Sequence, residues 1–387
     1  MVFPVWPEYA EDEVNAVQAV LRSGKVNYWS GDQGSRFEKE FATYVGTEYA
    51  IALANGTLAL EAALYALGIG DGDEVIVPAR TFVATASCVV MRGAIPVVAD
   101  IDLCSGNLTV ETIEAARTER TKAIIVVHLG GWPCDMPEIM AYAETHGLKV
   151  IEDCAQAHGA EIDGRKVGSF GHAAAFSFCQ DKIISTGGEG GMLVSNDHEV
   201  WRKAWALKDH GRDYDEVFNR EHGPGHRWFC TTFGSNWRLT ELQSAIGRIQ
   251  LKKLPEWLAI RRLYAAMIID DLSDVSGLNI HVPRDGIQHA YYRFYASIDL
   301  GSLHHDWNQD RVISAIAAEG IPCFHGSCSE IYREKAFESL MSDRYPLPNA
   351  QLSGQGSIAL LLHPTLQEEH IERTIEVVRK VLHRAVG

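Results

Sequence analysis

Short runs of apolar, often β-branched residues alternate with helical stretches over the first two thirds of the chain. Strands are expected at 49–53, 74–77, 95–99, 122–128, 149–153, 173–178 and 191–194, and helices at 58–67, 85–92 and 137–146. These strand-like runs lack polar alternation, which is typical of a mostly parallel sheet covered by helices on both faces. Ligands of such sheets bind beyond the carboxyl ends of the strands, where we therefore expect a site.

The pattern changes after residue 240. A long helical stretch at 242–269, broken by Pro255, is followed by a strand at 291–298 and by helices near 310–319 and 368–385. We therefore expect a large α/β domain over residues 1–245 and a smaller α+β domain over residues 246–387.

Composition narrows the classes of protein that remain. The chain has 387 residues, is 46% hydrophobic and carries a formal net charge of −16. This charge argues against a nucleic-acid partner, so any anionic substrate must be bound by local donors. No apolar run approaches the roughly 20 residues that span a bilayer, and the amino terminus lacks the pattern of a signal peptide. We expect a soluble, cytoplasmic protein that does not interact with membranes.

The eight cysteines are scattered along the chain and form no C-x-x-C pair. In a chain of this length they are interpreted as reduced, partly buried small side chains rather than as a disulfide framework or a zinc site. No metal site is expected.

The segment Asn55-Gly56-Thr57 lies between an expected strand and an expected helix. Backbone N–H groups and a threonine hydroxyl at the positive end of a helix dipole can hold a phosphate. The alternative is an ordinary capped junction, which such a segment also fits. This segment alone does not decide between a phosphate site and a capped junction.

Asp153 ends another expected strand, and Gln156 follows closely. A carboxylate there can hydrogen-bond a protonated pyridine nitrogen, while Gln156 can reach a phenolic oxygen on the same ring. The alternative for Asp153 is a helix N-cap. Glu152 should face the opposite side of the strand and be structural, and His158 is interpreted as a packed histidine.

Lys182 follows an expected strand and precedes a glycine cluster. Its amine can form a Schiff base and carry protons if its pKa falls from about 10.4 toward neutrality. Asp181 would oppose that fall at close range, so we expect its side chain to point away. Ser177 can donate its hydroxyl to the same phosphate. The alternative is a surface lysine in a glycine-flanked loop.

The motifs that contain these residues resemble the DegT/StrS-type sugar aminotransferases, which depend on pyridoxal 5′-phosphate (PLP). Matching blocks run almost end to end: ANGTLAL (54–60), VPARTFVATA (77–86), GAIPVVADID (93–102), VVHLGG (126–131), EDCAQAHGA (152–160), FSFCQDKIISTGGEGG (176–191), FGSNWRLTELQSAIGRIQL (233–251) and LLHPTL (361–366). The resemblance implies an aspartate-aminotransferase-like fold (fold type I) with a mostly parallel, seven-stranded type of sheet.

The resemblance also assigns roles to individual positions. Lys182 resembles the Schiff-base lysine, Asp153 the partner of the pyridine nitrogen, and Gln156 the residue beside the ring oxygen. The remaining cofactor positions are the phosphate residues Gly56, Thr57 and Ser177, the aromatic Phe82 over the ring, and Asn236, which reaches the phosphate in the neighbouring subunit. A homodimer with shared active sites is therefore implied. Without the family, Phe82 fits core packing equally well.

Three further residues are candidates for substrate contacts. His325 and His363 fall where family members build the sugar pocket, although the segment around His325 departs from the usual pattern. Arg238 fits either helix capping or the carboxylate of the amino donor, and the sequence does not choose between them.

The implied reaction moves an amino group from L-glutamate, through the pyridoxamine form of the cofactor, to the ketone of a nucleotide-linked keto-deoxyhexose. A 4-keto-6-deoxy sugar is the expected acceptor, in the biosynthesis of amino sugars and surface polysaccharides. The alternatives are a scyllo-inosose-type cyclitol aminotransferase and a PLP-binding regulator without catalysis. Relatives that dehydrate their substrate replace the lysine by histidine, so Lys182 argues against dehydration.

Overall fold

The computed structural model describes residues 2–225, 227–340 and 345–386. Its main element is a seven-stranded sheet in the order β1-β9-β8-β5-β4-β2-β3. The strands are β1 (Tyr49–Leu53), β2 (Glu74–Pro78), β3 (Ile95–Ala99), β4 (Thr121–Val127), β5 (Lys149–Asp153), β8 (Ala173–Ser177) and β9 (Gly191–Ser195). Strand β9 runs in the direction opposite to that of the other six strands. The expected mostly parallel sheet is confirmed.

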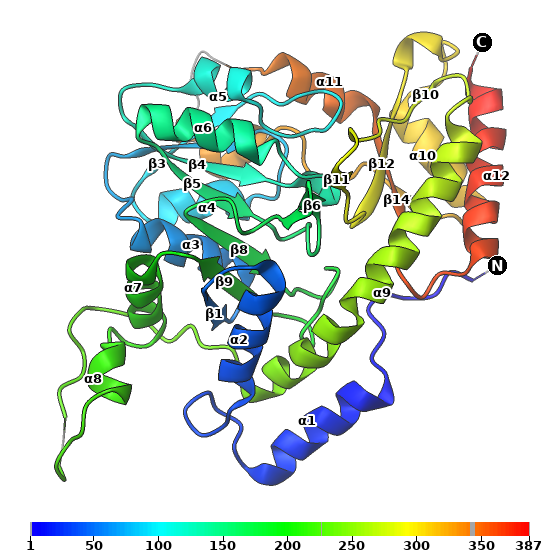
Figure 1. The fold of residues 1–387 in the computed structure, drawn as a ribbon. Coiled ribbons are helices and arrows are strands. Elements are labelled where there is room, and N and C mark those ends of the chain that lie inside the picture. Colours follow the sequence, from blue (N-terminus) through cyan, green and yellow to red (C-terminus); the bar gives the residue numbers. More distant parts are fainter. Residues whose placement is uncertain (1, 226, 341–344, 387) are drawn as a thin grey trace.

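Helices cover both faces of this sheet (Figure 1). One face packs on α3 (Gly56–Ala66), α4 (Ala84–Met91) and α7 (His198–Lys208), and the other packs on α2 (Gln33–Val45), α5 (Val110–Ala116) and α6 (Met136–His146). Successive strand residues alternate between two apolar cores, as Ile124 and Ile125 do. Burial on both faces explains why the strands show no polar alternation.

A second, four-stranded antiparallel sheet lies beyond the first. It consists of β10 (Leu278–Asn279), β12 (Arg293–Ile298), β14 (Ser357–Leu361) and β13 (Cys323–Phe324), in that order. It shares an apolar core with α10 (Gln309–Ala318) and α12 (Glu368–Ala385). Two short helices are α8 (Tyr214–Phe218) and α11 (Pro348–Gly356). A third, small sheet consists of β11 (Ile287–Gln288), β6 (Glu161–Ile162) and β7 (Arg165–Lys166). The 3-10 turns are η1 (Leu129–Gly131), η2 (Leu300–Ser302), η3 (Ile331–Arg333) and η4 (Lys335–Leu340).

Helix α9 (Glu241–Leu272) extends from an apolar core of the large sheet to the core of the small sheet (Figure 1). It continues through Pro255, so the expected break there is wrong. A proline inside a helix removes one N–H donor and costs about 3 kcal/mol. The buried side chains of Leu251, Leu254 and Leu258 flank the proline and anchor both halves of the helix in apolar cores. Tertiary packing therefore overrides the local preference.

The amino-terminal segment connects the two parts of the molecule. Helix α1 (Glu11–Ser23) packs on α9, and the Phe3 ring lies 5.2 Å from the His370 ring of α12. The domain boundary that we place near residue 245 falls inside α9. Within the described ranges, no helix has both the length and the hydropathy needed to cross a bilayer.

Candidate active site

A cavity of about 880 Å³ lies between the two sheets, at the carboxyl ends of β4, β5 and β8. This volume is in the range that holds a cofactor or small substrate. Its lining includes Gly56, Thr57, Phe82, Asp153, Gln156, Ser177 and Lys182 from the large-sheet side, and Tyr292, Arg293, Tyr295, Phe324 and Ser327 from the small-sheet side. Seven of the sequence-predicted residues therefore meet in one place.

One end of the cavity is the amino terminus of α3. Asn55 caps this helix, and its side chain accepts a hydrogen bond of 2.9 Å from the Leu58 N–H. Gly56 and Thr57, the first two residues of the helix, line the cavity. The first N–H groups of a helix have no hydrogen-bond partner inside the helix itself. Ser177, at the end of β8, lines the same region. This end can bind a phosphate.

Gly56 is required because the helix starts against the end of β8. A Cβ atom at this position would lie 2.7 Å from Cβ of Ser177. Similarly, a Cβ atom on Gly191 would lie 2.3 Å from the Asn55 carbonyl group. Two glycines therefore permit the close approach that places helix N–H groups beside a serine hydroxyl.

Substitution of Gly56 by alanine should weaken cofactor binding about tenfold or more. The added methyl group forces α3 and β8 apart, at a typical cost of about 1–3 kcal/mol. Titration of the cofactor-free variant with PLP measures the effect. Gly70→Ala is the control, since its added methyl would meet only the Arg92 carbonyl at 3.9 Å. Equal affinity in both variants would contradict the assigned phosphate end.

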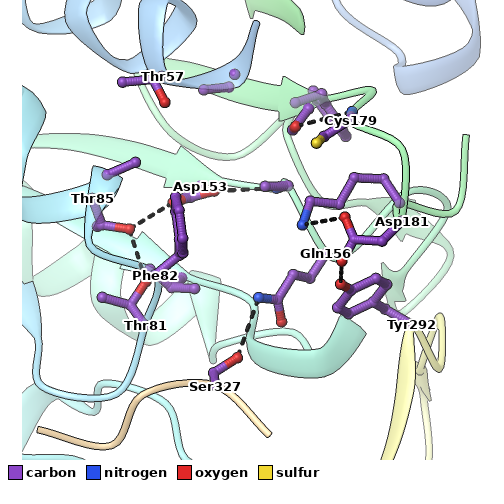
Figure 2. A pocket seen from close by; sticks show the side chains of 18 of the residues that line it. Thr57, Thr81, Phe82, Thr85, Asp153, Gln156, Cys179, Asp181, Tyr292 and Ser327 are labelled. Atoms are coloured by element: carbon purple, nitrogen blue, oxygen red, sulfur yellow. Dashed lines mark hydrogen bonds and ion pairs between the residues drawn. The ribbon is translucent and has the colours of Figure 1, made fainter. Parts of the chain in front are cut away.

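Asp153 is buried in the middle of the cavity wall (Figure 2). Its Oδ1 accepts a hydrogen bond of 3.1 Å from the Ala155 N–H, and Oδ2 accepts one of 2.9 Å from the Thr85 hydroxyl. Thr85 in turn lies 2.7 Å from the hydroxyl of Thr81. Burial raises the pKa of Asp153 even though these hydrogen bonds lower it. A buried carboxyl of this kind suits a protonated ring nitrogen, which would supply the missing positive charge.

Gln156 has a fixed orientation. Its Oε1 accepts a hydrogen bond of 2.7 Å from the Gly130 N–H, which assigns the other end as the amide nitrogen. That nitrogen lies 3.5 Å from the Ser327 hydroxyl, at the cavity wall (Figure 2). Gln156 can therefore donate a hydrogen bond to an oxygen on a bound ring.

Lys182 lines the same cavity as Asp153. Its side chain is 17% exposed, and its Nζ lies 3.2 Å from Oδ1 of Asp181 and 5.0 Å from the ring centroid of Tyr292. The backbone carbonyl of Lys182 accepts a hydrogen bond of 2.7 Å from the Trp6 indole. The amino-terminal segment thus holds the loop that carries this lysine.

One expectation about the surroundings of Lys182 is corrected. Asp181 points toward the amine, because its Oδ2 accepts a hydrogen bond from the Tyr292 hydroxyl and also faces Arg293. Burial lowers the pKa of Lys182, but Tyr292 and Asp181 outweigh burial, so the pKa is raised rather than lowered. The residues of the chain alone therefore keep this amine protonated.

Phe82 stands at the cavity wall with 67% of its side chain exposed (Figure 2). Such exposure argues against the core-packing interpretation. An aromatic face in this position can stack on a planar ring.

Four candidate residues lie outside the cavity lining. Asn236 is exposed, and the Arg238 guanidinium donates a hydrogen bond of 2.8 Å to the buried Asp209. His325 pairs with Asp310 at 2.7 Å. His363 is buried, hydrogen-bonds Thr365 and stacks on Trp6 with ring centroids 6.1 Å apart. Their proposed substrate and cross-subunit contacts stay predictions.

Glu152 and His158 both belong to the protein interior, as expected. Glu152 accepts hydrogen bonds from the backbone N–H groups of Gly168, Phe170 and Gly171, and from the His128 ring. A hydrogen bond from the Cys134 N–H occupies the other ring nitrogen of His128. The nearby group His128, Glu152 and Cys154 has the composition of a metal site, but these contacts already occupy the histidine and carboxylate. All eight cysteines are free, but the expectation that they are partly buried fails for three exposed ones, Cys104, Cys230 and Cys328.

His158 is packed between the rings of Phe176 and Phe178, with centroids 5.4 and 5.7 Å away. Burial lowers the pKa of His158 to about 3. The unfolded chain binds a proton near pH 6.5 and the folded chain does not, so this residue contributes stability above pH 6.5 that is lost as the pH falls toward 3.

We expect His158→Gln to reduce the acid sensitivity of folding. Between about pH 7.5 and about pH 5.5, the wild type should lose on the order of 1 kcal/mol through this residue, which the variant retains. Thermal midpoints of both proteins at the two pH values measure the difference, with the exposed His281→Gln as the control. An unchanged pH dependence would contradict a neutral, buried His158.

Comparison with known proteins agrees with this geometry. Residues 7–379 match the model of the DegT/DnrJ/EryC1/StrS aminotransferase family. The UDP-N-acetyl-3-dehydro-alpha-D-glucosamine 3-aminotransferase of Acidithiobacillus ferrooxidans is 40% identical, over 91% of this chain and 89% of that protein. GDP-perosamine synthase of Caulobacter vibrioides is 39% identical, with 89% of each chain covered.

A solved structure extends the comparison to the fold. The aminotransferase from Psychrobacter cryohalolentis superposes with a TM-score of 0.96, is 49% identical, and covers 99% of each chain. The cavity, its lysine and its buried carboxyl thus occur in an aminotransferase fold of type I. The chain belongs to the DegT/DnrJ/EryC1/StrS aminotransferase family and is a PLP-dependent aminotransferase.

Proposed function

We propose that this aminotransferase moves the amino group of L-glutamate to the ketone of a nucleotide-linked keto-deoxyhexose, with a 4-keto-6-deoxy sugar as the preferred acceptor. The observation that supports this most is the convergence of Lys182, Asp153 and the amino terminus of α3 on one cavity. The names of the two relatives given above refer to a UDP-linked sugar and to a GDP-linked sugar.

In this proposal, the two ends of the cavity orient the cofactor. Gly56, Thr57 and Ser177 would hold its phosphate, Asp153 would pair with its ring nitrogen, and Phe82 would cover one face of the ring; all five line the cavity. Bound PLP supplies the aldehyde that accepts an amino group and the ring that takes up the resulting electrons. Gln156 would donate its amide N–H to the ring oxygen, because the Gly130 N–H fixes the orientation of the amide.

Lys182 moves protons in the same proposal. Its neutral Nζ would take a proton from the carbon that gives up nitrogen and deliver a proton to the carbon that receives nitrogen. Asp181 is placed to stabilise the charged amine between these steps, since its Oδ1 lies 3.2 Å from Nζ. Tyr292 holds that carboxylate through its hydroxyl.

We also propose a homodimer in which Asn236 of each subunit completes the site of the other. The support is that Asn236 is exposed and absent from the cavity lining of its own subunit. The segment before it projects from the body of the molecule with α8 (Figure 1) and exposes 96% of Phe233. Aromatic side chains are enriched at protein interfaces relative to the rest of the surface.

Mixed dimers test this arrangement. Asn236→Ala and Lys182→Ala subunits, each inactive alone, should regain up to about a quarter of wild-type activity when coexpressed, because half the dimers are mixed and each contains one intact site. No recovery in mixed dimers confirmed by mass would contradict the shared site.

An acceptor screen tests the substrate class. The enzyme, first exposed to glutamate, should recover the absorption of the aldehyde cofactor when a 4-keto-6-deoxy sugar linked to UDP, dTDP or GDP is added. Recovery only with scyllo-inosose would favour the cyclitol alternative and contradict the proposal.

A further inference from the structure

The charges of the cavity do not by themselves favour an anionic substrate. The protein carries a net charge of −16, and the lining of the cavity includes the carboxyl groups of Asp153, Asp181 and Glu189. Lys182 and Arg293 are the cations of the same lining. A substrate with carboxylates or a diphosphate therefore needs a local cation to offset this repulsion.

Arg293 is the first residue of β12 and lines the cavity with a side chain that is 23% exposed. Its guanidinium carbon lies 4.8 Å from the ring centroid of Tyr292. Among the described residues, its one polar side-chain contact is a loose ion pair of 3.8 Å with Oδ2 of Asp181. A guanidinium has five N–H donors, so most of them are available to a ligand.

The other arginines near the cavity already donate hydrogen bonds to groups of the protein. Arg80 hydrogen-bonds the hydroxyls of Ser353 and Ser357, and Arg261 hydrogen-bonds backbone carbonyls. Arg238, which the sequence analysis considered for the carboxylate of the amino donor, donates a hydrogen bond to Asp209. These contacts leave Arg293 as the guanidinium of the lining that can meet an incoming anion.

We propose that Arg293 binds an oxyanion of the substrate, either a carboxylate of the amino donor or the diphosphate of the sugar nucleotide. Asp181 links the two cations, with Oδ1 near Lys182 and Oδ2 near Arg293. A substrate anion on the guanidinium is thus held close to the reacting amine. The planar fork of arginine matches both carboxylate and phosphate oxygens in pairs. This inference rests on the proposed function.

Arg293→Gln and Arg293→Lys holoenzymes test the inference in two arms. The first arm measures the KM and rate constant of the glutamate half-reaction from the loss of cofactor absorption. The second measures the Kd of UDP, dTDP and GDP by calorimetry. We expect Arg293→Gln to raise the glutamate KM or a nucleotide Kd about 10- to 100-fold, and Arg293→Lys to restore part of that loss.

Each arm identifies one source of the oxyanion. Arg311→Gln is the control, because this arginine is 49% exposed and pairs with Asp306 away from the cavity lining. An unchanged KM and unchanged Kd values in a folded, cofactor-loaded Arg293→Gln would overturn the inference. So would a lower rate constant with unchanged KM and Kd, since Arg293 would then act only through Asp181.

Failure of the proposed function has a different signature. A wild-type enzyme that loses no cofactor absorption with glutamate and does not bind nucleotides would contradict the donor and acceptor classes themselves. A responsive wild type with an equally responsive Arg293→Gln would contradict only the role of Arg293.

Discussion

Lys182→Ala should lower amine transfer by at least about 10⁴-fold, because the variant loses both the nucleophile and the proton carrier of the site. The residues that we propose to hold the phosphate, Gly56, Thr57 and Ser177, are unchanged, so the variant should still bind PLP without a covalent bond. Steady-state release of 2-oxoglutarate gives the activity. Intact mass after borohydride reduction should show cofactor fixed to the wild type and not to the variant.

The exposed Lys252→Ala is the matched control, since it removes a lysine from α9 without touching the cavity. It should retain wild-type activity and covalent cofactor. A folded Lys182→Ala variant that transfers amines at the wild-type rate would contradict the assignment and would favour a regulator or another chemistry.

Asp153→Asn should lower amine transfer by about 10²- to 10³-fold, the range seen when one preorganised electrostatic contact is removed. Asparagine preserves the shape of the side chain but removes the negative charge that a protonated ring nitrogen requires. The rate constant of the glutamate half-reaction measures this loss, with bound cofactor quantified in parallel.

A milder variant separates charge from local structure. Thr85→Val removes the 2.9 Å hydrogen bond to Asp153 but leaves the carboxylate in place, so it should lower the rate less than Asp153→Asn does. A Thr85→Val effect equal to or larger than that of Asp153→Asn would show that packing around the carboxyl group, rather than its charge, controls the rate.

The strands of the large sheet could be predicted because burial on both faces leaves a simple signal of apolar runs. The runs at 49–53, 95–99 and 149–153 match β1, β3 and β5. Asp153 ends one such run and Lys182 follows another, which places both residues at the same edge of the sheet. The meeting of these two residues in one cavity could therefore be predicted from local patterns.

The orientation of Asp181 was not accessible in the same way. Tyr292, which fixes it, lies 111 residues further along the chain, and nothing in the local sequence of either residue indicates this pairing. Arg293 was missed for the same reason, because it reaches the cavity from the other sheet. Pro255 shows the converse case, in which a strong local signal is overridden by buried leucines on either side.

The transfer of nitrogen itself is the central claim, and isotope labelling tests it most directly. The holoenzyme would be incubated with ¹⁵N-labelled L-glutamate and a nucleotide-linked 4-keto-6-deoxy sugar, and the products analysed by mass spectrometry. We predict equal amounts of 2-oxoglutarate and of an amino sugar nucleotide that contains ¹⁵N, with neither formed by Lys182→Ala. A sugar product without ¹⁵N, or one that has lost a hydroxyl group without gaining nitrogen, would contradict this account.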